Sequence, residues 1–85
     1  MNAKVRKKYM KILNNLQEGS QNYKILKHLL EHGTITTFDA FNKYRITRLS
    51  GRIFDLKELG VNIESNIVYK KLEGETVHYA VYTVK

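Results

Sequence analysis

A change in the spacing of the apolar residues at Gly60 constrains the fold of this chain more than any other feature. Before Gly60, apolar residues recur every three or four positions, which is the period of a helix packed on a core. After Gly60, apolar and polar residues alternate over residues 61–70 and again over 76–84, which is the period of a strand. A short loop with a glycine separates the two alternating runs, so they predict a β-hairpin.

Residues that start and stop helices divide the first part of the chain. The predicted helices cover residues 2–16, 23–32, 38–44 and 47–59. Gly19, Gly33 and Gly60 end three of them. Thr36 or Thr37 is expected to cap the short helix, and Thr47 the helix that follows it. The β-branched residues 34–37 are too few to be more than an extended connector.

The order of these elements predicts the fold class. A short helix, a link of a few residues and a longer helix form a helix-turn-helix, and a hairpin placed directly after it is the arrangement of a winged helix-turn-helix. We therefore expect an α+β protein with a three-helix core and a C-terminal β-hairpin wing over residues 20–85. Residues 1–19 add a basic amphipathic N-terminal helix.

A set of residues spread through this region carries a closer resemblance. The set is Thr34, Ile35, Thr36, Ala40, Tyr44, Ile46, Arg48, Leu49, Arg52, Ile53, Asp55, Leu56, Gly60, Ile63, Tyr79 and Tyr82. In this pattern the stretch 23–84 resembles the small winged helix-turn-helix domains encoded by bacteriophages and related mobile elements. The resemblance implies the fold and a DNA-binding function as expectations. The basic helix at the N-terminus lies outside it.

The charge of the chain is concentrated in two places. The chain has 15 Lys and Arg against 8 Asp and Glu, which gives a net charge of +7. Residues 1–17 hold five bases and no acid, and residues 43–57 hold five bases and one acid. Two basic clusters on an otherwise neutral body predict a polyanionic partner, nucleic acid before membrane.

The helix 47–59 is the predicted reader of the major groove. Leu49, Ile53 and Leu56 project inward, and Arg48 lies near the N-terminal end, where recognition helices meet base edges. The expected base-reading residues are Arg45, Thr47, Arg48, Ser50, Gly51 and Arg52. The expected phosphate contacts are Lys43, Lys57, Lys70 and Lys71, together with Arg6, Lys7 and Lys8 from the N-terminal helix.

Three residues of this helix leave alternatives open. Gly51 allows either close approach to a groove wall or packing against the preceding short helix. Asp55 is expected to pair with Arg52 three residues earlier, which would still orient Arg52 towards phosphate. Phe54 projects to the exposed arc and is interpreted as a core residue, either because the helix is rotated or because Phe54 packs under the wing or a partner.

Other classes of function find little support. Without cysteine there is no disulfide, thiolate metal site or cysteine nucleophile. His28 and His32 are spaced as a metal-binding pair could be, but a solvated helix face explains them better. No metal, cofactor or enzymatic activity is expected, because paired carboxylates and a phosphate-binding loop are both lacking. The tyrosines of the hairpin fit cross-strand packing, with stacking on single-stranded bases as the alternative.

The sequence therefore predicts a cytoplasmic double-stranded DNA-binding protein of a bacterial host cell, with no membrane segment. It would be a phage or mobile-element transcriptional regulator or an excisionase-like factor. The alternative is a phage-encoded winged-helix module that binds or inhibits a host or defence protein, which the mixed Lys and Glu residues near the wing tip favour.

The N-terminal helix bears on the oligomeric state. Its apolar stripe consists of Val5, Tyr9, Ile12, Leu13 and Leu16. An isolated helix of this length is marginal in water, so the stripe needs a surface. That surface is either the flank of its own domain or the same helix of a second copy, and a homodimer is expected. A basic arm that folds only on DNA is the remaining alternative.

Overall fold

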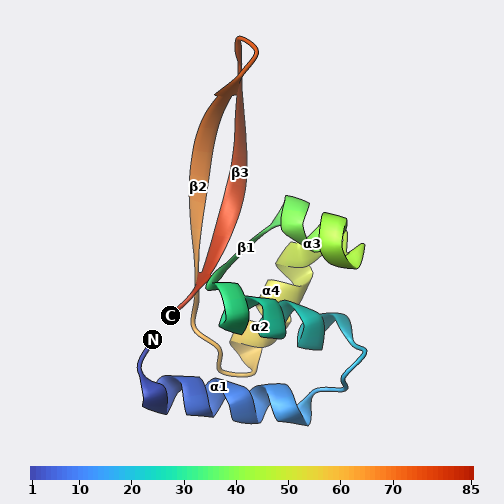
Figure 1. Ribbon diagram of the computed structural model, residues 1–85, viewed down its shortest axis with the longest axis vertical. Coiled ribbons are helices and arrows are strands. Elements are labelled where there is room, and N and C mark those ends of the chain that lie inside the picture. The colour runs from blue at the N-terminus through green and yellow to red at the C-terminus, as the bar shows by residue number, and fades with distance from the viewer.

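The computed structural model describes all 85 residues, as four helices and three strands (Figure 1). The elements are α1 (Ala3–Asn15), α2 (Gln21–His32), β1 (Thr34–Thr36), α3 (Thr37–Tyr44), α4 (Leu49–Glu58), β2 (Ile63–Leu72) and β3 (Glu75–Val84). Helices α2, α3 and α4 form the three-helix core, and β2 and β3 form the wing. The predicted α+β winged-helix architecture, with an additional N-terminal helix, is confirmed.

Side-chain caps fix where three of the helices begin. The Asn2 side chain accepts a hydrogen bond from the backbone N–H of Val5 at the start of α1. The Ser20 side chain accepts one from the backbone N–H of Tyr23 at the start of α2. Thr36 and Asp39 form a reciprocal capping box at the start of α3, each side chain accepting from the backbone N–H of the other at 3.1 Å.

The predicted cap of α4 is wrong. Arg48, not Thr47, directly precedes α4, and no side chain caps this helix. The link between α3 and α4 is one residue longer than the sequence pattern indicated, so Thr47 does not occupy the capping position. The N-terminal N–H groups of α4 are therefore left without a side-chain acceptor.

The prediction that residues 34–37 are no more than an extended connector is also wrong. Residues Thr34–Thr36 form β1, which pairs antiparallel with β3 so that Thr34 lies opposite Thr83, and the sheet order is β1-β3-β2. Ile35 on this strand is fully buried. A run of three residues has no recognisable period by itself, and it becomes a strand because β3 supplies the edge with which it pairs.

The wing is a long two-stranded hairpin. Its strands pair over ten positions, from Ile63 opposite Val84 to Leu72 opposite Glu75. Glu73 and Gly74 form the turn with φ values of +49° and +83°, the left-handed pair that a two-residue hairpin turn requires. Only the base of the hairpin joins the core, and its outer half projects beyond the helices (Figure 1).

Helix α1 packs on the flank of its own domain. Tyr9 and Leu13 are buried and belong to the same hydrophobic cluster as the residues of α2 and α4. The Tyr9 hydroxyl donates to the carbonyl of Lys85 at 2.9 Å and accepts from the backbone N–H of Asn62 at 3.0 Å. Of the alternatives for the apolar stripe, the structure therefore shows an intramolecular contact.

The histidines of α2 differ from the predicted solvated face. His32 is exposed, but His28 is only 3% exposed and its Nδ1 lies 2.8 Å from the hydroxyl of Tyr44. Burial lowers the pKa of His28, and the neighbouring side chains of His32 and Lys43 lower it further. Tyr44 is the last residue of α3, so the contact between His28 and Tyr44 ties α2 to α3.

None of the helices combines the length and the apolar character needed to cross a membrane.

Candidate nucleic-acid interface

The link between α3 and α4 is held from inside and is polar outside. Ile46 is 1% exposed and anchors the link in the core. Arg45 ends α3 in the left-handed conformation with φ +58°, and its guanidinium lies 5.5 Å from the centre of the Phe41 ring, in reach of a cation–π contact. Thr47 and Arg48 follow and are both exposed. The link thus presents two arginines and a threonine to solvent.

Helix α4 continues this polar surface on the side away from the core. Leu49, Ile53 and Leu56 are buried, as the helical projection predicted. Ser50 and Lys57 are exposed on that side. The predicted base-reading residues lie close together in the chain, in the link and in the first four residues of α4.

Gly51 leaves a gap in the outer surface of α4. A Cβ atom built on this residue would have no neighbouring atom within 4 Å. The alternative in which Gly51 packs against α3 is therefore wrong. The backbone of the helix is open to approach from outside at this position.

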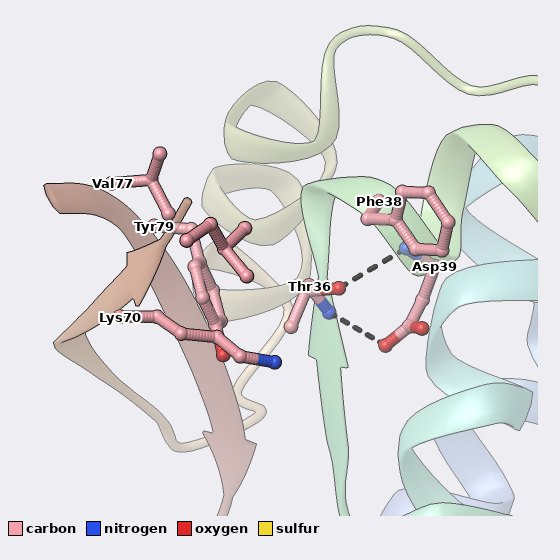
Figure 2. Close-up of a pocket in the computed structure, with 7 residues that line it drawn as sticks. Thr36, Phe38, Asp39, Lys70, Val77 and Tyr79 are labelled. Carbon is pink, nitrogen blue, oxygen red and sulfur yellow. Dashed lines mark hydrogen bonds between the residues drawn. The ribbon is translucent and has the colours of Figure 1, made fainter. Parts of the chain in front are cut away.

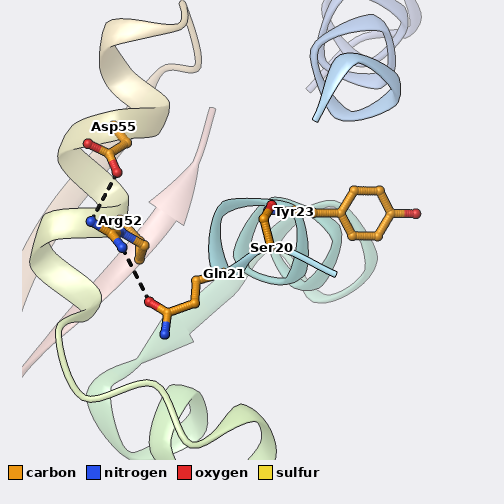
Figure 3. A network of polar contacts seen from close by, with 5 residues as sticks. All are labelled: Ser20, Gln21, Tyr23, Arg52 and Asp55. Atoms are coloured by element: carbon orange, nitrogen blue, oxygen red, sulfur yellow. Dashed lines mark hydrogen bonds and ion pairs between the residues drawn. The ribbon is translucent and has the colours of Figure 1, made fainter. Parts of the chain in front are cut away.

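Arg52 is engaged within the domain (Figure 3). Its guanidinium lies 3.2 Å from the carboxylate of Asp55, which confirms the predicted pair, and it also donates to the side-chain oxygen of Gln21 at 3.3 Å. Gln21 is the first residue of α2, directly after the Ser20 cap. Arg52 therefore joins α4 to the start of α2, a contact that sequence spacing could not indicate.

The interpretation of Phe54 as a core residue is wrong. Its side chain is 61% exposed on the outer arc of α4, where the helical projection placed it. Leu59, at the end of the same helix, is 49% exposed. The C-terminal part of α4 therefore exposes two large apolar side chains among its charged residues.

Four cations around the α3–α4 region have no acidic partner. The structure contains two ion pairs, Arg52 with Asp55 and Lys85 with Glu64. The cations left over in this region are Lys43, Arg45, Arg48 and Lys57. Since the only acid between residues 43 and 57 is already paired, these charges are available to an external anion.

The three bases of α1 that were predicted to contact phosphate differ in their surroundings. Arg6 donates to the carbonyl of Leu30 at 3.1 Å, so it satisfies the C-terminal end of α2. A Cβ atom at Gly60 would lie 3.8 Å from the end of the Lys8 side chain, which places Lys8 beside the end of α4. Lys7 is exposed.

The wing lysines lie apart from α4. Lys70 and Lys71 are in the outer half of β2, next to a turn that carries Glu73 and Glu75. The two carboxylates offset the two ammonium groups. The wing therefore adds little net charge to the basic region of α3 and α4.

Comparisons with known proteins agree with this geometry. Residues 20–85 match the model of a protein family described as a winged helix-turn-helix domain. No curated protein and no solved structure matches the chain.

Proposed function

The chain belongs to the winged helix-turn-helix family, and from this membership we propose that it binds double-stranded DNA with α4 in the major groove. A winged helix-turn-helix domain suggests DNA binding, and such domains are typically not enzymes. The observation that carries the proposal is the group of four unpaired cations along α3, the link and α4: Lys43 at the end of α3, Arg45 and Arg48 in the link, and Lys57 in the last turn of α4. Unpaired positive charge on the exposed side of a helix-turn-helix attracts the phosphate backbone.

Each residue of the proposed interface has a chemical reason. Arg48 is proposed to read guanine through two hydrogen bonds, since it is exposed at the start of α4. Arg45, Thr47 and Ser50 surround it, and Gly51 lets a groove wall approach the helix. Lys43 and Lys57, with Lys7 and Lys8 of α1, are proposed phosphate contacts; Lys70 and Lys71 would touch flanking backbone. Arg52 is proposed to fix the orientation of α4 relative to α2 through its hydrogen bond to Gln21, with its guanidinium facing a phosphate group.

The biological role is proposed on narrower support. We infer a transcriptional regulator or an excisionase-like factor of the phage or mobile-element type, from the resemblance over residues 23–84. A homodimer would let two α4 helices read a two-fold symmetric site. Because the apolar stripe of α1 is buried in its own domain, the contact between copies would use other surfaces. Sedimentation of the chain with and without duplex DNA measures the stoichiometry directly.

The salt dependence of duplex binding tests the proposed function. If about five or six phosphates are neutralised, the logarithm of the association constant should fall against the logarithm of salt concentration with a slope of roughly −4.5 to −5.5. Fluorescence anisotropy of a labelled duplex measures this slope. A folded protein that binds no duplex even at low salt would contradict the proposal.

Substitutions of two cations should separate reading from positioning. Arg48→Ala is expected to cost about 1–3 kcal/mol of discrimination between a selected site and a scrambled one, because a bidentate base contact is lost. Lys57→Ala should weaken binding to both sequences by similar factors. Competition binding with the two duplexes gives the comparison, and equal losses of discrimination in both variants would show that Arg48 does not read bases.

Gly51→Ala should change stability and DNA affinity in opposite directions. The added methyl group meets no atom of the domain and improves helix propensity by up to about 1 kcal/mol. It also fills the gap that the proposal assigns to a groove wall, so duplex affinity should fall. Asn42→Ala, at an exposed position of α3 to which the proposal assigns no DNA contact, is the control for a small change on the surface. A more stable Gly51→Ala variant with unchanged affinity would remove Gly51 from the interface.

A further inference from the structure

One edge of the wing is left open. Strand β1 pairs with only three residues of β3, from Val81 to Thr83, so residues 75–80 have no neighbour on that side. The backbone N–H of Val84 donates to Gly33, on the β1 side, and that of Lys85 donates to Asn62, on the β2 side.

Backbone groups alternate in direction along an antiparallel strand, so even-numbered residues of β3 face the β1 side. Thr76 and His78 therefore direct both their N–H and C=O groups to the open edge, and Ala80, next to the Val81–Thr36 pair, directs its N–H group there. These groups have no strand partner in the chain.

The open edge borders a groove of about 490 Å³ between the wing and the start of α3 (Figure 2). Val77 and Tyr79 of β3 and Leu72 of β2 line one side, and Phe38 of α3 lines the other. Phe38 is 73% exposed, although it lies directly after a capped helix start, where a polar residue would serve as well. The groove therefore combines unpaired backbone groups with apolar side chains.

This surface is poorly suited to DNA. Glu73 and Glu75 at the wing tip would repel phosphate, and the groove itself is mostly apolar. Proteins usually protect a long open edge with proline, a bulge or charged residues on the edge strand. Residues 76–80 of β3 contain no proline and no Asp, Glu, Lys or Arg. An edge left open in this way can pair with another strand.

We propose that the open edge of β3 and the adjoining groove bind an extended segment of a partner protein, which pairs antiparallel with β3 and continues the line of β1. Strand addition of this kind takes affinity from backbone hydrogen bonds and specificity from alternate side chains. The segment would place apolar side chains against Phe38, Val77 and Tyr79. Lys70 lines the groove without an ion pair, and Asp39, the one acid of the lining, accepts a hydrogen bond from the Thr36 N–H, so a carboxylate on the segment matches Lys70.

The occupant is a single strand rather than the wing of a second copy. A second wing would bring its own β2 alongside its β3, into the space where α3 flanks the groove (Figure 2). A single extended segment requires only one strand's width. The proposal does not depend on the DNA-binding function, because the groove uses none of the four unpaired cations of the α3–α4 region and shares only Lys70 with the proposed contacts to flanking DNA.

The test uses a displayed library of random peptides of about eight residues, a length typical of strands, against the full chain. Enriched peptides should carry apolar residues at alternate positions and an acidic residue. Their affinities are then measured by anisotropy, and backbone amide shifts in NMR spectra should move at Thr76, His78 and Ala80. Absence of any enriched peptide, or enriched peptides whose shifts map elsewhere, would overturn the proposal.

Two proline substitutions give a matched comparison. His78→Pro removes an N–H from the open edge and spares the ladder to β2, and should weaken peptide binding about tenfold, the loss of one backbone hydrogen bond with its unmet partner. Tyr69 lies opposite His78, and its backbone groups face the other edge of the wing, so Tyr69→Pro should leave peptide binding unchanged. Equal losses in both variants would contradict strand addition at β3.

A side-chain variant keeps the test valid if proline disturbs the wing. Phe38→Ser changes an exposed residue of α3 outside the hairpin and should also weaken peptide binding. Duplex affinity should stay unchanged in all three variants. A loss of duplex affinity in Phe38→Ser or His78→Pro, but not in Tyr69→Pro, would assign the groove to DNA and overturn the proposal.

Discussion

Replacing Tyr9 with alanine is expected to lower the free energy of unfolding by about 3–5 kcal/mol, the usual cost of removing a large aromatic side chain from a core. Tyr9 is 3% exposed. It joins α1 to the rest of the domain through the packing of its ring and through two hydrogen bonds of its hydroxyl. Denaturant unfolding followed by circular dichroism measures the change.

Two companion variants divide this effect. Tyr9→Phe keeps the ring and leaves the carbonyl of Lys85 and the N–H of Asn62 without their partner, which should cost about 1–3 kcal/mol. Met10→Ala changes the adjacent residue, which is 36% exposed, and should stay within about 0.5 kcal/mol. If Tyr9→Ala destabilises no more than Met10→Ala, α1 is not docked on the domain.

The second large effect is expected on the inner face of α4. Leu56 is fully buried, so Leu56→Ala should lower the free energy of unfolding by about 2–5 kcal/mol through lost apolar burial and the cavity left behind. Leu59→Ala makes the same chemical change at a side chain that is 49% exposed, and should cost far less. The same unfolding experiment compares the two.

The comparison of these leucines also tests the orientation of α4. The proposed interface requires that the arc with Arg48 faces outward, and this is true only when Leu56 faces inward. Similar losses in the two variants would mean that the helix is rotated about its axis, and that a different set of side chains faces solvent.

Much of the fold could be predicted because its signals are local. The alternation after Gly60 indicated the wing, and cap residues and glycines placed most helix ends within a few positions. Strand β1 could not be predicted, because its three residues become a strand only by pairing with β3, almost fifty residues later in the chain. Such a pairing leaves no periodic trace in the sequence.

The candidate site was predictable to a similar degree. The inward and outward faces of α4 followed from a helical projection, as did the pair of Arg52 with Asp55. The contact of Arg52 with Gln21 joins residues 31 apart, so only the packed structure reveals it. The projection of Phe54 to the outer arc is correct, and its interpretation as a core residue is wrong because no other element covers that arc.

The hydrogen bond from Tyr9 to Lys85 joins residues 76 positions apart. During synthesis, α1 is complete long before Lys85 has left the ribosome. The Tyr9 hydroxyl therefore cannot form its hydrogen bonds with Asn62 and Lys85 until the wing has been translated. Until then the base of the hairpin is not fastened to α1. During synthesis the basic helix α1 therefore lacks its polar anchor until Lys85 has emerged, so the docking of α1 is completed late, after the wing has been made.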